Sequence, residues 1–498
     1  MDRTTRIKVA WSALLSLFWA VFLWNFWSRG VEALGLNAAV HLAALFGLFV
    51  WTMREEGIRW RKNLFWLVPI GLIILSFALY DNPFLKTVSL LVLPVAFAVF
   101  YNFAFLEMSR SLHWDSRLVG KLVSRGLSLI GSLGKSVAAH VGIFSSAKAQ
   151  NGLVRRILLG LFLFVAIALT IVVPLLSSAD TVFAASLQGL LTWFRNLFGT
   201  AIAYKILVGL LFSVLTTAAV FAWGRRHAHR PGEDGETQTD SVVVGIVLGG
   251  ILLLYLFFLA IQFRNIWVGS LPFDFETAVQ LVKSGFWQLL VLSVLNIAVY
   301  FLAYRKTVPL VQRILGAFTF ASFLLLISAG HRMALYVAHY GLSYEKLFAA
   351  YTVLFCAVLF VWLISRLFVP YRSNILKFLV VLFVWMFGVA AVLPVEQLIL
   401  RTNVALSKTD GSRVRLYELT MLSPDVLNLV RHYQATGKLR ENPYYLQQAR
   451  RHSPPGMSDD DLQPDWGFWL ESRERQTCRK AWYEKTVANW AVSCPERE

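Results

Sequence analysis

The segment 328–345 is the most polar stretch that lies between two strongly apolar runs of this 498-residue chain. It contains His331 and His339, and histidine is a residue type that binds metals and transfers protons. In a helix the two histidines would share a face but lie about 12 Å apart, whereas zinc binds nitrogen at about 2 Å. This spacing argues against a metal site made from the segment alone.

Arg332, Tyr336 and Tyr340 would share another face of the same helix. A guanidinium group beside two phenols can bind an anion, such as a lipid phosphate, through charge-assisted hydrogen bonds. The alternative is a helix at the membrane surface, whose arginine extends toward water and whose tyrosines join the aromatic residues common there. The spacing fits both interpretations.

Other charged residues lie in separate connections between apolar runs. They could join His331 and Arg332 in one site that combines acids, bases and an anion-binding group. These candidates are Asp180, Asp274, Glu276, Glu396 and Arg401. The alternative is that the connections carry charge because they meet water.

The sequence contains no Gly-rich phosphate loop followed by Lys-Ser/Thr, no His-Glu-x-x-His and no Gly-x-Ser-x-Gly. We therefore predict no cofactor, no metal and no catalytic residue, which favours a protein that is not an enzyme. The main polar residues inside the apolar runs are His41, Lys205 and Asn296. Ion-coupled transporters usually place carboxylates at mid-membrane, so this composition argues against that class.

The composition is that of an integral membrane protein. Hydrophobic residues make up 57% of the chain and charged residues 15%, against about a quarter charged in soluble proteins. The apolar runs have about the 20 residues that a helix needs to cross a bilayer. We predict an all-α, polytopic transmembrane bundle of about eleven spans: 9–28, 34–52, 63–80, 84–106, 156–177, 199–222, 242–264, 285–304, 308–328, 347–367 and 374–393.

The distribution of charge predicts how the bundle is oriented. If the N-terminus is cytoplasmic, every inner connection holds more Lys and Arg than its outer neighbours, as the positive-inside rule requires. The same rule explains the net charge of +18 without nucleic acid. The first run is too long for the apolar core of a signal peptide and is expected to remain as an anchor.

Four segments follow from this pattern. A four-span bundle covers 1–107 and a seven-span bundle covers 156–393. Between them, 108–155 is basic and amphipathic, which predicts binding to the anionic lipids of the inner leaflet. The alternative for this connection is a docking site for a cytoplasmic partner. The tail 394–498 is predicted to be helical, to lie outside the cytoplasm and to be able to bind an envelope protein.

The tail carries clear helix-start signals. Ser423-Pro424-Asp425 combines a capping hydroxyl, a proline at the first helical position and an acid near the positive end of the helix dipole. Asn442-Pro443 repeats the device. The tail's tryptophans could fill a small core or contact the membrane surface.

Cys478 and Cys494 are candidates for a disulfide, because the predicted topology places both in an oxidising compartment. The alternative is one continuous helix from 478 to 494, which would hold the two about 24 Å apart and forbid the bond. Both possibilities remain open on sequence grounds.

Several motifs together resemble a family of bacterial multi-pass membrane proteins, the domain of unknown function 4173, and its relative 4153. The motifs are Gly35-Leu-Asn37, the segments 174–180 and 328–336, Tyr340-Gly-Leu342, the segment 394–403 and Leu422-Ser-Pro-Asp425. Of the family's motif after the last span, the chain keeps only Pro394, Arg401 and Asn403. The resemblance implies a bacterial integral membrane protein and supplies no catalytic residues. We expect this protein to lie in the cytoplasmic membrane.

Three hypotheses for function follow. The first is a scaffold, sensor or binding module whose outer loops and tail bind a partner protein or a lipid-linked ligand. The second is a transporter or flippase for an amphipathic or lipid-linked substrate, which needs a polar cavity near His41, Lys205 and Asn296. The third is an envelope transferase that uses a lipid carrier, with Asp180, Asp274 or Glu276 beside His331 or Arg332.

Overall fold

The fold was established from a computed structural model of the chain. It describes residues 3–55, 64–107, 132–140, 201–223, 246, 248–257, 290–297, 299–300, 308–368, 375–409, 412–452, 462–490, 492 and 494. Every regular element in these ranges is a helix. The chain separates into two compact units: 1–229 with 477–498, and 230–476. The predicted tail 394–498 is therefore divided between the two units.

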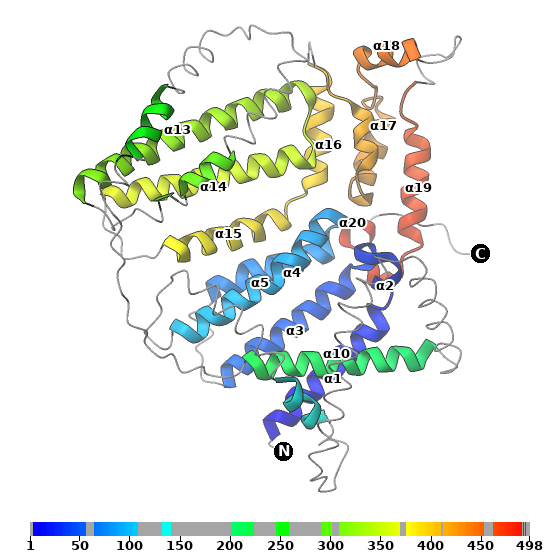
Figure 1. The fold of residues 1–498 in the computed structure, drawn as a ribbon. Coiled ribbons are helices and arrows are strands. Elements are labelled where there is room, and N and C mark those ends of the chain that lie inside the picture. Colours follow the sequence, from blue (N-terminus) through cyan, green and yellow to red (C-terminus); the bar gives the residue numbers. More distant parts are fainter. Residues whose placement is uncertain are drawn as a thin grey trace, which may run out of the picture. The chain divides into compact units, whose positions relative to one another are not determined.

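The first unit is a layer of long apolar helices (Figure 1). α1 packs against both α10 and α3, α3 packs against α4, and α4 packs against α5. The helices are α1 (Arg3–Phe22), α2 (Phe26–Arg29), α3 (Leu36–Glu55), α4 (Leu64–Leu79), α5 (Pro83–Glu107) and α10 (Ala201–Trp223). The same unit contains two short helical segments of the tail, η6 (Trp482–Glu484) and α20 (Val487–Trp490).

The helix α1 shows how this unit sorts its side chains. Ser12 and Ser16 are buried, and each hydroxyl donates to the carbonyl oxygen four residues earlier, so neither polar group is left without a partner. Large apolar side chains remain exposed along the same helix: Trp11, Leu14, Leu17 and Val21. An exposed apolar stripe opposite a buried polar one is the arrangement expected of a helix that faces lipid.

Part of the predicted basic connection belongs to this unit. Residues 132–140 form a helix that meets α10, where the Ser136 hydroxyl donates to the Val214 carbonyl oxygen at 2.7 Å. His140 lies 2.8 Å from the Ser213 hydroxyl. This helix is therefore packed against protein on one side. The rest of 108–155 lies outside the described residues.

The second unit is built on a helical hairpin. α13 (Pro309–Tyr340) and α14 (Tyr344–Phe368) run side by side and share a large apolar core (Figure 1). The core is filled by leucine and aromatic side chains, including the fully buried Leu315, Phe318 and Leu359. Gly341 ends α13 with φ +75°, a conformation that glycine adopts without strain.

A sharp bend separates the last long apolar helix from the helices that follow. α15 (Ile375–Ala391) and α16 (Val395–Leu406) are bent by 69° at Pro394. α16 then packs on the segments that follow it through the apolar side chains of Val395, Ile399 and Leu400. Those segments are η4 (Leu416–Met421), η5 (Pro424–Val426), α17 (Leu427–Ala435), α18 (Pro443–His452) and α19 (Trp466–Cys478). Trp466 and Trp469 are buried in the same core.

The described residues include four helices long and apolar enough to cross a membrane, or six if each bent pair is one span. The prediction of an all-helical membrane protein is confirmed for this part of the chain, whereas the prediction of about eleven spans is not. Three predicted spans coincide with apolar segments of 10 to 17 described residues: Phe65–Leu79, Lys205–Phe221 within α10, and Leu248–Phe257. The predicted span 156–177 lies outside the described residues.

The helix that contains the predicted span 308–328 extends beyond it. α13 has 32 residues and runs from Pro309 through Tyr340, so it includes most of the polar stretch. His331, Arg332, Tyr336 and Tyr340 therefore occupy the last turns of a single long helix. Polar side chains there do not stop the helix, since their backbone groups still find partners within it.

Candidate functional site

In the first unit the tail forms a closed loop. Cys478 and Cys494 are joined by a disulfide, with their Cα atoms 5.6 Å apart. The segment between them is not one continuous helix, because α19 ends at Cys478 and two short helical segments follow. We call residues 478–494 the disulfide loop. It binds to the rest of the first unit through two sets of contacts, each centred on a buried carboxylate, that of Asp81 or that of Glu484.

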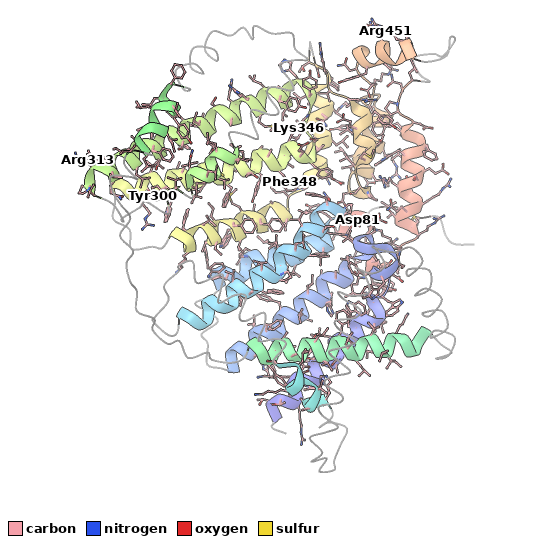
Figure 2. All side chains as sticks on the ribbon, viewed as in Figure 1. Asp81, Tyr300, Arg313, Lys346, Phe348 and Arg451 are labelled. Atoms are coloured by element: carbon pink, nitrogen blue, oxygen red, sulfur yellow. A yellow bond between two sulfur atoms is a disulfide. The ribbon has the colours of Figure 1, made fainter. Side chains whose placement is uncertain are left out.

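The first set is centred on Asp81, in the turn that joins α4 to α5 (Figure 2). One carboxylate oxygen of Asp81 accepts a hydrogen bond from the Lys86 ammonium at 2.8 Å. The other accepts from the Lys480 ammonium and from the Asn489 side-chain amide. All four residues are less than 5% exposed. Two residues of the disulfide loop thus bind one buried carboxylate, which makes the charge pairs directional as well as attractive.

The second set is centred on Glu484 in the disulfide loop, whose side chain is fully buried. Its carboxylate accepts from the Asn25 amide at 2.7 Å and from the Arg29 guanidinium. It also accepts from the backbone N–H of Ala481 at 3.1 Å. Every donor is a neutral or cationic N–H group, so the buried negative charge is compensated.

The turn before α3 allows the backbone of the disulfide loop to approach closely. Leu36 donates its backbone N–H to the Lys485 carbonyl oxygen at 3.3 Å. A side chain at Gly35 would overlap the backbone of Glu484, so only glycine permits this approach. The Asn37 side chain accepts from the Gly35 and Ala38 N–H groups and thereby fixes the turn. The motif Gly35-Leu-Asn37, noted in the sequence for its resemblance, has a physical role here.

Acid should loosen the disulfide loop. Burial alone would raise the pKa of Asp81, but the ammonium groups of Lys86 and Lys480 outweigh burial and hold that pKa below its ordinary value. A carboxyl whose pKa is lowered on folding contributes stability above its unfolded pKa, about 3.9, and loses it as pH falls through the folded value. We expect cleavage of the loop by pepsin to rise steeply below about pH 4.

The control for this acid effect is Asp81→Asn, in which the group that titrates is gone. Because pepsin itself is active only in acid, cleavage of both proteins is expressed relative to that of an unfolded substrate at the same pH. On this scale we expect the loop of Asp81→Asn to be cleaved readily at every pH at which pepsin is active, with no steep rise. An identical pH profile in the two proteins would show that other carboxylates govern the loop.

In the second unit Glu396 has a comparable position. It is buried at the start of α16, directly after the bend at Pro394. Its carboxylate accepts from the Ser423 N–H at 3.1 Å, from the Ser423 hydroxyl and from the Tyr344 hydroxyl. Ser423 also caps η5 by accepting from the Asp425 N–H. The predicted helix start at Ser423 therefore also binds the carboxylate of Glu396.

Asn403, about two helical turns after Glu396 on α16, binds the turn between α13 and α14. Its side-chain oxygen accepts from the Leu342 N–H at 2.6 Å, and its amide donates to the Leu342 carbonyl oxygen at 2.8 Å. The Asn403 side-chain amide thus binds both backbone groups of Leu342, as a neighbouring strand would. A side chain at Gly341 would come within 2.6 Å of the Asn403 oxygen, which is too close. Glycine there serves both the turn and this contact.

Glu441 is a third buried carboxylate of the second unit. It accepts from the backbone N–H groups of Leu416 at 3.0 Å and Tyr417 at 2.9 Å. Its neighbour Asn442 donates to the Ser412 carbonyl oxygen at 2.6 Å. The predicted helix start at Asn442-Pro443 coincides with the start of α18, and the residues around it also anchor the chain before η4.

The predicted anion-binding residues on α13 have a partner that the sequence did not indicate. The rings of Tyr336 and Tyr340 lie 5.2 Å apart, and the Lys346 ammonium lies 4.5 Å from the centre of the Tyr336 ring. Lys346, labelled in Figure 2, also donates to the carbonyl oxygens of Tyr340 and Gly341 and so binds the end of α13. The tyrosines therefore lie beside a lysine from α14.

The remaining predicted candidates are placed as follows. His331 and Arg401 are exposed, Arg332 is partly buried and Glu396 is buried. Glu396 and Arg401 share α16 but differ in environment, since only the carboxylate lies among hydrogen-bond donors of the protein. Three candidates lie outside the described residues: Asp180, Asp274 and Glu276. Within the described ranges, no group of three or more His, Cys, Asp or Glu residues could hold a metal ion.

Sequence reasoning missed the residues that bind the disulfide loop. Asp81 lies in the short turn between two apolar runs and Lys86 in the first turn of the helix that follows, so a charge pair five residues apart was a usable signal. No local signal connects them to Lys480, Glu484 or Asn489. The pairing partner is about 400 residues away along the chain, as the Asp81–Lys480 separation of 399 shows.

Comparison with known proteins gives one match. Searches of curated proteins and of solved structures found no match. A protein-family model, described as Domain of unknown function (DUF4153), matches residues 67–432. This is the relative of family 4173 named above, and the comparison does not show membership of 4173 itself. The match includes Asp81, Glu396, Asn403 and Ser423 but ends before the disulfide loop. The chain is thus a helical membrane protein that belongs to the DUF4153 family.

Proposed function

We propose that the protein is a multi-pass scaffold or binding module of the bacterial cytoplasmic membrane, with its polar face outside. The observation that carries this proposal is that the buried carboxylates are bound by other groups of the protein. Asp81, Glu396, Glu441 and Glu484 each accept hydrogen bonds from donors of the protein itself. Carboxylates used in this way hold helices and turns together, whereas a general acid or base needs a free path to a substrate.

The proposed orientation has support of its own in the first unit. The disulfide loop contacts the segment after α1, the turn before α3 and the turn between α4 and α5. In a bundle whose helices alternate in direction, these three places lie on one side of the membrane. A disulfide at this side fits an oxidising, extracytoplasmic compartment, and the N-terminus then lies in the cytoplasm, as the positive-inside rule predicts.

The packing around the candidate transport residues favours a scaffold over a transporter or flippase. Asn296 accepts from the Tyr255 hydroxyl at 2.7 Å within the apolar core of the second unit. In the first unit, the Lys205 ammonium lies over the Trp24 ring, and His41 stacks against Phe18. Aromatic and apolar neighbours of this kind fill space that a polar substrate path would need. The transferase hypothesis depends on Asp180, Asp274 and Glu276, which the structure does not describe.

The exposed basic residues are the proposed contact points for a partner. We expect a photo-crosslinking amino acid at Arg401 or His331 to form a discrete protein adduct in cells. Leu324 is the matched control, because it is exposed in the middle of α13 and is expected to face lipid. Arg332→Ala should weaken the adduct formed at position 401, as loss of a charge-assisted contact would.

Crosslinking only to lipid at positions 331 and 401, with unchanged behaviour of Arg332→Ala and Arg401→Ala, would remove the basis for a partner at this face. Reporter fusions after residues 55 and 498 test the orientation separately. An active periplasmic reporter after residue 55 would contradict it.

A further inference from the structure

The disulfide loop distributes its side chains in the opposite way to a water-soluble segment. Most of the side chains buried in it are polar: Lys480, Glu484, Thr486 and Asn489 are all less than 5% exposed, and Val492 is the apolar exception among its described residues. Its large apolar groups are outside: Trp482 is 66% exposed, and Val487 and Trp490 are each 57% exposed. Buried polar groups combined with exposed large apolar groups are the informative departures from ordinary burial.

The cause of this inversion lies in what the loop binds. Its polar groups are directed at the charged and amide groups of the first unit, namely Asp81, Asn25 and Arg29. The side chains between them then point away from that surface. Water would be a poor environment for those side chains, because exposing a tryptophan forgoes the gain from burying its large apolar area.

The neighbours of the loop place these side chains at the level where a membrane span ends. Tyr483 packs edge to face on Phe22, the last residue of α1, with ring centres 5.2 Å apart. Trp27 is 63% exposed and lies between Asn25 and Arg29, which both bind Glu484. The exposed apolar stripe of α1 leads up to this point. Tryptophan is enriched where a bilayer meets water, because its ring is apolar and its N–H is polar.

We propose that Trp482, Val487 and Trp490, together with Trp27, form a membrane anchor that inserts into the interfacial region of the outer leaflet. The exposed Arg479 beside them supplies a cation for the lipid phosphates. The occupant of this apolar surface is therefore lipid rather than a second protein. The inference rests on the chain being a membrane protein and does not depend on the proposed partner at Arg401.

This anchor gives the buried charges a second function. By binding Asp81 and Arg29, Lys480 and Glu484 hold the disulfide loop flat against the helix ends. The tryptophans are thereby directed at the bilayer instead of collapsing into a core of the tail. The separate tail core of the second unit does the reverse, because it buries its own Trp466 and Trp469.

The test measures how deep each position lies in a bilayer. Full-length protein is placed in nanodiscs of phosphatidylethanolamine and phosphatidylglycerol. A spin label is attached through an unnatural ketone amino acid at position 482, 487 or 490, so that Cys478 and Cys494 remain paired. Collision with oxygen, which concentrates in lipid, is compared with collision with a nickel chelate, which stays in water.

Two reference positions calibrate the result. Leu14, 57% exposed on α1, represents the lipid interior, and Lys438, an exposed residue of the second unit, represents water. We expect the ratio of oxygen to nickel collisions at 482, 487 and 490 to be severalfold higher than at Lys438 and lower than at Leu14. A ratio equal to that at Lys438 would overturn the proposal. Poor access of both reagents would also overturn it, because it would mean that protein covers the surface.

A misfolded loop must be excluded in the same samples. Resistance of the loop to protease in detergent, compared with the unlabelled protein, shows that it remains bound. A fourth label site is Ala488, at a less exposed position of α20. It should report lower access to both reagents than 487 and 490, and equal access at all three positions would contradict the directional anchor.

Discussion

Replacing Asp81 by asparagine should lower the free energy of unfolding of the first unit by about 3 to 5 kcal/mol, the range found when one partner of a buried charge pair is removed. The change places an amide N–H₂ group where a carboxylate oxygen accepted from Lys480 and Asn489. The ammonium groups of Lys86 and Lys480, which shared one negative charge, then repel each other. Both side chains are buried, so water screens this repulsion only weakly. The measurement is denaturant unfolding of the purified protein in mild detergent.

The matched control is Glu471→Gln. Glu471 also pairs with a cation, Arg475, but both side chains are more than half exposed. Pairs of this kind contribute roughly 0 to 1 kcal/mol, so the control should unfold almost as the unaltered protein does. Asp81→Asn combined with Lys480→Met should recover part of the loss, because one of the two repelling charges is gone. Equal stability of Asp81→Asn and Glu471→Gln would contradict the assignment of Asp81 as the centre of the loop's binding site.

Replacing Gly35 by alanine should displace the disulfide loop from the turn before α3. The added methyl group would overlap the Glu484 backbone and come within 2.9 Å of the Lys485 carbonyl oxygen. Because these are backbone atoms, no side-chain rotation can relieve the overlap, and the loop itself has to move. We expect a loss of about 3 kcal/mol, at the upper end of the range for overpacking. Faster proteolysis of residues 479–493 in the altered protein is the readout.

Gly47→Ala is the control for this change. Gly47 lies inside α3, the helix that follows Gly35, and a methyl group there meets nothing within 4 Å. Alanine should be tolerated or slightly stabilising at that position, since it has the higher helix propensity. If the loop resists proteolysis equally well in Gly35→Ala and in Gly47→Ala, the close approach of the two backbones does not limit binding of the loop.

The features that could be predicted from sequence are those with local causes. The apolar runs 63–80 and 84–106 gave two helices close to the observed α4 and α5, because each run satisfies its own backbone and needs no partner to be recognised. The starts at Ser423 and Pro443 were predicted for the same reason, since capping acts within a few residues. Even the resemblance relied on short motifs.

The parts that sequence did not predict depend on distant partners. Glu396 was a candidate ligand group because it follows a span, but its environment is decided by Ser423 and Tyr344, which come from two other segments. Trp466 and Trp482 look alike in the sequence, yet one is 5% and the other 66% exposed. Their difference comes from what packs on each, and no periodicity within the tail encodes it.

The long-range pairing of Asp81 has a consequence for how the protein is made. Lys480 and Asn489 follow Asp81 by 399 and 408 residues. At about 5 to 20 residues per second, a ribosome needs roughly 20 to 80 s to reach them. Throughout that interval the buried carboxylate of Asp81 lacks these two partners. In the proposed topology, insertion of the first helices and closure of the surface around Asp81 are therefore separate events in biogenesis, because the residues that complete this surface are made much later.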